Sequence, residues 1–197
     1  MTVGILAGGQ SHRMGTDKAR LEVDGTPLLE RLARESLSAG FPVLVVGRTR
    51  PDDWPLDGTA FTPDDGPGRG PLGGLETALG LTEGPVIAVA CDLPLLTGDA
   101  LRWLADCADE RGGPHGLAVR SGGQWEPLFS VYSPTCLPLI GERLAAGRLS
   151  LHGLFEAGDF GHVDAPEWVA AQLVNVNTPE DLRNFLSLRP IDPATPG

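Results

Sequence analysis

Short apolar runs alternate along this chain with longer segments in which apolar residues recur at helical spacing. Three of the runs, Val3–Ala7, Val43–Val46 and Pro85–Ala90, contain no polar side chain. Strands that are apolar throughout are buried on both faces, which is typical of a parallel sheet covered by helices on both sides. The alternation therefore predicts an α/β fold with a mainly parallel sheet.

The remaining elements continue this alternation. The first helix is predicted over Thr26–Ala39, because Pro27 suits a first helical position and Gly40 suits the position after the last turn. Further helices are predicted over Pro71–Leu81, Gly98–Glu110, Pro134–Ala146 and Ser150–Glu156, with a last one from Thr178, and further strands over Gly116–Arg120, Glu126–Tyr132 and Leu173–Val176. We expect one domain over residues 1–188, followed by a proline-rich, disordered tail over 189–197.

The charge and the cysteines limit the classes of partner and compartment. A net charge of −11 at pH 7 argues against nucleic acid and anionic membranes, because the long-range field of the protein would repel both. The three cysteines have no metal-binding spacing, and no apolar run approaches the roughly 20 residues that span a bilayer. We expect an unprocessed, soluble protein of the reducing cytoplasm.

The first predicted strand runs into the glycine-rich stretch "GGQSHRMGTDK" at 8–18. Glycines let a backbone approach a ligand closely, so that successive N–H groups can converge on phosphate oxygens. Arg13 and Lys18 add local positive charge, but the stretch matches neither the P-loop nor the dinucleotide fingerprint. It indicates either a binding loop for a nucleoside triphosphate or an ordinary strand-to-helix turn with solvated charges.

Asp92 follows directly on the apolar run that ends at Ala90 and Cys91. Open α/β sheets bind their ligands at the carboxyl ends of the strands. A carboxylate in that place, with Pro94 to stiffen the chain after it, can hold Mg²⁺ against phosphate oxygens. The alternative is a helix cap or a hydrogen bond that orders the loop.

Four segments of the chain, "LAGGQSHRMGTDK", "RGPLGGLETAL", "VACDLPLL" and "LVNVNTPEDL", resemble the landmark motifs of the molybdenum cofactor guanylyltransferases. The resemblance extends over nearly the whole chain, in order. It implies a Rossmann-like three-layer sandwich of the nucleotide-diphospho-sugar transferase type. It also implies transfer of GMP from GTP to the phosphate of the molybdenum–molybdopterin cofactor, with release of pyrophosphate and with Mg²⁺ as cofactor.

The same resemblance implies roles for particular residues. Lys18, Arg13 and Asp92 would be catalytic, with Asp92 also the metal ligand, and Asn175 and Asn177 would face the acceptor. The implied nucleotide contacts are Leu6, Ala7, Gly8, Gly9, Gly15, Lys18, Asp64, Gly73 and Asp92. The chain departs from the family in having Gly47 and Arg48 where Asn is frequent, and Asp65 competes with Asp64 for the family aspartate.

Alternative functions stay open on the sequence alone. A relative could use another nucleotide or acceptor, as in cytidylyl transfer to the same cofactor or nucleotidyl transfer to a sugar phosphate. A noncatalytic nucleotide-binding relative on the same fold is the third alternative. The expected partners are GTP and the molybdopterin cofactor, together with proteins that deliver the cofactor or accept it during molybdoenzyme maturation.

The segment "GQWEPLF" also admits two interpretations. The corresponding family segment borders the cleft, so Gln124–Phe129 could approach the acceptor. The alternative, slightly favoured, is a strand whose Trp125 and Phe129 only contribute to packing.

Overall fold

The fold is known from a computed structural model that describes residues 1–8, 22–23, 25–63, 68–176 and 181. The strands are β1 (Thr2–Leu6), β2 (Glu22–Val23), β3 (Thr26–Pro27), β4 (Val43–Val46), β5 (Thr59–Thr62), β6 (Val86–Ala90), β7 (Gly116–Ser121), β8 (Gln124–Trp125), β9 (Phe129–Tyr132) and β10 (Gly161–Asp164). The helices are α1 (Leu28–Ser38), α2 (Gly70–Leu81), α3 (Gly98–Arg111), the 3-10 turn η3 (Pro134–Cys136), α4 (Leu137–Ala145), α5 (Leu151–Ala157) and α6 (Glu167–Ala170).

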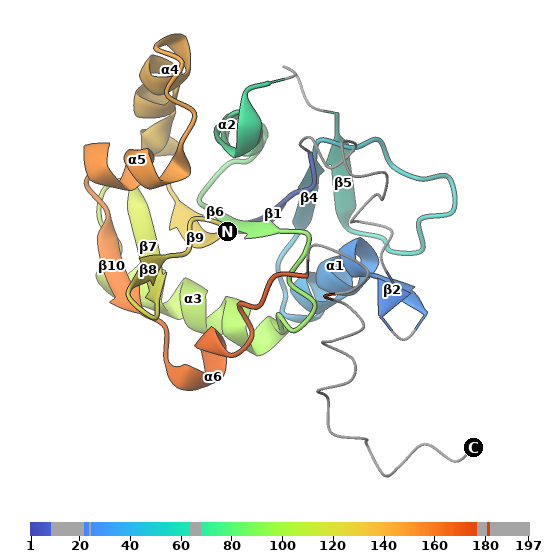
Figure 1. The fold of residues 1–197 in the computed structure, drawn as a ribbon. Coiled ribbons are helices and arrows are strands. Elements are labelled where there is room, and N and C mark those ends of the chain that lie inside the picture. The colour runs from blue at the N-terminus through green and yellow to red at the C-terminus, as the bar shows by residue number, and fades with distance from the viewer. Residues whose placement is uncertain (9–21, 24, 64–67, 177–180, 182–197) are drawn as a thin grey trace.

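The main sheet has the order β10-β7-β9-β6-β1-β4-β5, with β8 added to β7. The strands β5, β4, β1 and β6 are parallel to one another, and β9 lies antiparallel between β6 and β7. Helices α1 and α3 cover one face, while α2, α4 and α5 cover the other (Figure 1). The predicted α/β three-layer sandwich with a mainly parallel sheet is therefore confirmed.

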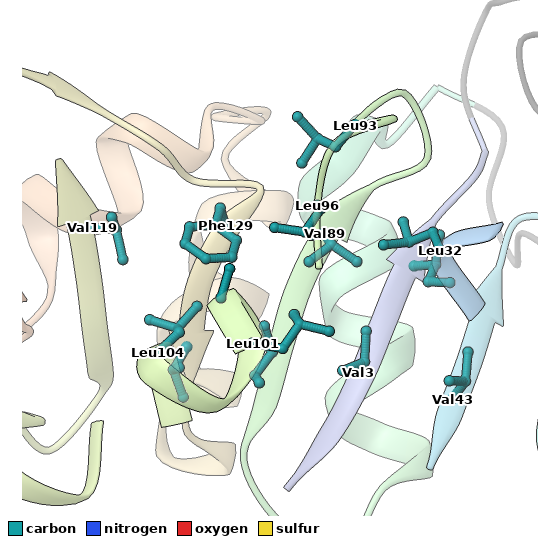
Figure 2. Close-up of a cluster of buried hydrophobic side chains, with 14 of the residues drawn as sticks. Val3, Leu32, Val43, Val89, Leu93, Leu96, Leu101, Leu104, Val119 and Phe129 are labelled. Atoms are coloured by element: carbon teal, nitrogen blue, oxygen red, sulfur yellow. The ribbon is translucent and has the colours of Figure 1, made fainter. Parts of the chain in front are cut away.

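Alternating residues of each central strand enter two separate cores, which explains why these strands are apolar throughout. Val3 and Ile5 of β1 contact the core under α1 and α3, whereas Leu6 contacts the core under α2 and α4. Figure 2 shows the first core, where Leu101 and Leu104 of α3 and Leu32 of α1 lie against the strand valines.

Most predicted elements agree with the structure, but some of their ends differ and one strand was not predicted. Helix α1 begins at Leu28 because Thr26–Pro27 pairs with Glu22–Val23 in a two-stranded ladder. The predicted strand Glu126–Tyr132 begins only at Phe129, because residues 126–129 form a hydrogen-bonded turn around Pro127, which has no N–H to pair. The strand β5, Thr59–Thr62, which pairs with β4, was not predicted.

The predicted strand Leu173–Val176 is wrong. The last paired strand is β10, which runs parallel to β7, and residues 173–176 have no regular structure. They lie against the loop after β6 instead, where the Val176 N–H donates to the Asp92 carbonyl at 2.9 Å. The helix predicted from Thr178 and the tail at 189–197 lie outside the described residues, apart from Asp181, which is helical. None of the described helices combines the length and apolar character needed to cross a bilayer.

Candidate active site

The carboxyl ends of the central strands meet at one edge of the sheet. Leu6 pairs with Val46 on one side and with Ala90 on the other, so the segments that follow these residues leave the sheet side by side. After β1 the chain first extends the sheet through β4 and β5, and then returns to add β6 on the opposite side of β1. This reversal creates a crevice at the ends of β1 and β6, which is where open α/β sheets bind ligands.

The glycine-rich segment begins in direct contact with the end of β4. Gly47 has a positive φ of 93°, and a Cβ atom on it would lie 2.4 Å from the Gly8 Cα and 2.5 Å from the Gly8 nitrogen. The next residue, Arg48, donates from Nε to the Ala7 carbonyl at 3.3 Å. Position 47 therefore carries glycine, where the resembling family often has Asn, for a steric reason. Only glycine fits between the end of β4 and the backbone of Gly8.

Asp92 lies in a loop whose main chain is fixed from two sides. The Val176 N–H donates to the carbonyl of Asp92, and Nε of Arg31 in α1 donates to the carbonyl of Pro94 at 3.1 Å. The following helix, α3, begins at Gly98 and has Thr97 as its N-cap, whose side chain accepts from the Ala100 N–H. Asp92 is therefore not the cap of α3, which excludes the helix-cap interpretation of this residue.

A cavity of about 480 Å³ opens beside Asp92. Its walls come from the loop after β6, the turn before β9, the start of α5 and the irregular segment after α6. The lining includes Asp92, Leu93, Trp125, Glu126, Pro127, Leu149, Ser150, His152, Leu173 and Asn175. Apolar walls with a few polar groups are typical of small-molecule sites, so the crevice has room for a ligand next to Asp92.

Glu126 is the second acid of this cavity. Its side chain is half-buried, and its carboxyl makes neither a hydrogen bond nor an ion pair in the part of the chain that the structure describes. Burial raises the pKa of this carboxyl above its ordinary value. A carboxyl held in such a place without a cation is suited to accept hydrogen bonds from a ligand.

The structure places several of the predicted site residues. Leu6 and Ala7 are buried at the end of β1, Gly8 is exposed, and Gly73 is buried in the first turn of α2. Asn175 is exposed and lines the cavity with Asp92, although it does so from an irregular segment and not from a strand face. Outside the described residues lie Gly9, Arg13, Gly15, Lys18, Asp64, Asp65 and Asn177.

Two features of the site escaped the sequence analysis. Arg31 reaches the Asp92 loop from a helix 63 residues away in sequence, and nothing in the sequence marks that contact. His152 at the start of α5 and Leu149 just before it line the cavity, although the sequence predicted only a helix in this place. The segment around Trp125 and Glu126 did carry a signal, because polar residues there interrupt an apolar strand pattern just before a proline.

The oxygen donors around the cavity fit a hard divalent cation. Asp92 and Asn175 supply a carboxylate and an amide oxygen, the ligand types that Mg²⁺ takes. Within the described ranges no group of three or more His, Cys, Asp or Glu side chains is placed to enclose a metal. The donor set therefore suits an ion held by one or two carboxylates and completed by substrate oxygens and water.

The site combines three features: a strand followed by a glycine-rich segment, an aspartate at the end of the neighbouring strand, and a cavity beside that aspartate. This combination is typical of α/β proteins of the nucleotidyltransferase class. The sequence matches the MobA-like NTP transferase domain over residues 3–159, and the chain belongs to that family. The family membership inferred from the four motifs is thereby confirmed.

Relatives of known name agree with this assignment. A probable molybdenum cofactor guanylyltransferase of Carboxydothermus hydrogenoformans is 31% identical over 195 residues, which cover 95% of this chain and 96% of that protein. The crystal structure of molybdopterin-guanine dinucleotide biosynthesis protein A of Archaeoglobus fulgidus has a TM-score of 0.74 at 23% identity, covering 93% of this chain and 96% of that one. A Mycobacterium tuberculosis protein crystallised with manganese has a TM-score of 0.62 at 18% identity, with 94% and 97% of the two chains covered.

Proposed function

We propose that this nucleotidyltransferase moves GMP from GTP to the phosphate of the molybdenum–molybdopterin cofactor and releases pyrophosphate. The observation that carries the proposal is the position of Asp92: the end of β1 pairs with the end of β6 just before it, and the 480 Å³ cavity opens beside it. A transferase of this kind needs both substrates to meet at the α-phosphorus of the nucleotide. The names of the relatives supply the identity of nucleotide and acceptor.

The chemistry needs little covalent help from the protein. An oxygen of the acceptor phosphate attacks the α-phosphorus of GTP in line, and the bond to the bridging oxygen of the β-phosphate breaks. A phosphate nucleophile is already largely ionised at neutral pH, so that no general base is required. We assign Leu6, Ala7, Gly8, Gly9, Gly15, Asp64 and Gly73 to the nucleotide, and Asn175 and Asn177 to the acceptor.

Positively charged groups stabilise the leaving pyrophosphate in this proposal. We assign Arg13 and Lys18 to the phosphates, where their charge counters the acidic chain. The first turn of α2 lies at the same edge of the sheet, since Pro71 lines the cavity beside Asp92, so the positive end of this helix dipole is near the proposed phosphate site. Mg²⁺ held by Asp92 would neutralise charge on the phosphate oxygens, and the manganese-bound relative favours a divalent metal.

Nucleotide preference tests the proposal without an acceptor. Titration calorimetry with Mg²⁺ is expected to give an affinity for GTP at least about tenfold higher than for CTP or ATP. The reason is the guanylyl-type pair of motifs, Gly8-Gly9 and "GPLGG" at 70–74. Equal affinity for CTP would move the protein to the cytidylyl alternative.

Arg31 offers a test of how the Asp92 loop is held. Arg31→Met removes the hydrogen bond to the Pro94 carbonyl, and we expect nucleotidyl transfer to fall severalfold while thermal stability changes little. Arg34→Met is the matched control, since Arg34 lies on the same helix but is exposed and pairs only with Glu30. An equal loss of activity in both variants would show that the bond to Pro94 does not position Asp92.

A further inference from the structure

The turn that carries Glu126 is held in place by several hydrogen bonds. The Glu126 N–H donates to the Val119 carbonyl at 2.9 Å, and the Glu126 carbonyl accepts from the Phe129 N–H at 3.0 Å. The buried hydroxyl of Ser130 donates to the same carbonyl at 2.7 Å. The main chain of Glu126 is thus fully engaged, while its carboxyl has no partner among the described residues.

A second contact stiffens the same turn. The hydroxyl of Tyr132, which is wholly buried, donates to the Pro127 carbonyl at 2.8 Å. Trp125, just before the turn, is held between Phe155 and the guanidinium of Arg120, with ring centroid distances of 5.5 Å and 5.3 Å. The carboxyl of Glu126 is therefore presented to the cavity from a preorganised support, as ligand-selecting groups require.

The charges of the cavity decide which part of an acceptor can lie beside Glu126. Asp92 and Glu126 both line it, and a phosphate placed against Glu126 would meet a second negative charge. A neutral, flat ring with hydrogen-bond donors avoids that repulsion. The apolar side chains of Trp125, Leu149 and Leu173 in the same wall suit such a ring.

We propose that Glu126 selects the acceptor by accepting hydrogen bonds from the adjacent ring N–H and NH₂ groups of a 2-amino-4-oxopteridine. This inference rests on the proposed function, because the cofactor that accepts GMP contains that ring. Two donors side by side match the two oxygens of one carboxylate. Glu126 is in this account a specificity-determining residue, and the metal remains with Asp92.

Binding of two simple pteridines tests the inference without turnover. The probes are 6-carboxypterin, which carries the 2-amino group, and 6-carboxylumazine, which has an oxygen in that place. Fluorescence titration of the full chain is expected to show about tenfold tighter binding of the pterin, because a carboxylate acceptor next to a carbonyl oxygen is repelled. Equal binding of the two probes by the wild-type protein would overturn the inference.

Two variants test whether Glu126 causes this preference for the pterin over the lumazine. Glu126→Gln should lower the pterin preference to nearly one, whereas Glu110→Gln, a change at an exposed position on α3, should leave it intact. In nucleotidyl transfer, Glu126→Gln should raise the KM of the acceptor about tenfold and leave the KM of GTP and the Mg²⁺ dependence unchanged. A shifted Mg²⁺ dependence would make Glu126 a metal ligand and overturn the proposal.

The outcomes separate this inference from the proposed function. Binding of Mg²⁺–GTP and a pterin preference that depends on Glu126, without GMP transfer, would refute the proposed reaction and support the pterin site. GMP transfer to the cofactor with an acceptor KM that Glu126→Gln does not change would support the reaction and refute the role of Glu126.

Discussion

Asp92→Asn is expected to lower guanylyl transfer by on the order of 10²-fold while the protein keeps its thermal stability. The substitution preserves the size of the side chain but removes the negative charge from the proposed metal site. The Asp92 main chain keeps its hydrogen bond from Val176, and the cap of α3 belongs to Thr97, so that both of these structural contacts remain in the variant. The activity that remains should require higher Mg²⁺ concentrations.

The measurement is transfer rate against Mg²⁺ concentration, with a thermal melt of each variant. Asp109→Asn is the control, because Asp109 is exposed on α3 and lines no cavity beside Asp92. A stable Asp92→Asn protein with full activity and unaltered Mg²⁺ dependence would leave only the loop-ordering interpretation of this residue.

Gly47→Ala is expected to weaken GTP binding by about tenfold or more and to destabilise the fold by over ~1 kcal/mol. Two causes act together, the positive φ of 93° and the collision of the new Cβ with the Gly8 backbone. Because the new Cβ collides with backbone atoms of Gly8 and not with a flexible side chain, the collision is removed only if the start of the glycine-rich segment moves. That segment is the proposed phosphate site, so the loss should appear in the affinity for the nucleotide.

Gly40→Ala separates the two causes. Gly40 has nearly the same φ, 91°, but a Cβ on it would have no neighbour within 4 Å. The Gly40→Ala protein should have a lower free energy of unfolding, because of backbone strain, and should retain its affinity for GTP. Calorimetric titration of both variants measures the difference, and equal GTP affinities for Gly47→Ala and Gly40→Ala would refute the coupling between Gly47 and the nucleotide segment.

The central sheet could be predicted from the sequence because its strands are buried on both faces. Val43–Val46 has the predicted bounds, β6 begins one residue later than predicted, and β1 is shifted by one residue at each end. Short elements at the edges of the sheet were harder to predict from the sequence. The strand Thr59–Thr62 has polar threonines at both ends and an exposed Ala60, so it lacks the apolar run that marks the interior strands.

The misassigned strand Leu173–Val176 shows where local pattern fails. Alternating valine and asparagine is typical of a strand with one buried face, but a strand also needs an edge with which to pair. In this fold β10 already occupies the edge beside β7, and the backbone of 173–176 bonds to the Asp92 loop instead. Long-range competition of this kind is invisible in a single sequence.

The site could be predicted in part. Motif resemblance led to Asp92 and to the end of β1, and the structure brings both to the same crevice. Arg31 acts through a contact with a residue far away in sequence, and no local pattern distinguishes it from other surface charges. The segment around Glu126 could be noticed in the sequence, but its place beside Asp92 depends on the fold.

Detection of the transferred nucleotide tests the central claim most directly. The full chain is incubated with GTP labelled at the α-phosphate, Mg²⁺ and the molybdenum–molybdopterin cofactor, and both products are measured. The account predicts labelled cofactor and pyrophosphate in equal amounts, with far less product from CTP or ATP. Pyrophosphate release without labelled cofactor, or equal transfer from CTP, would contradict it.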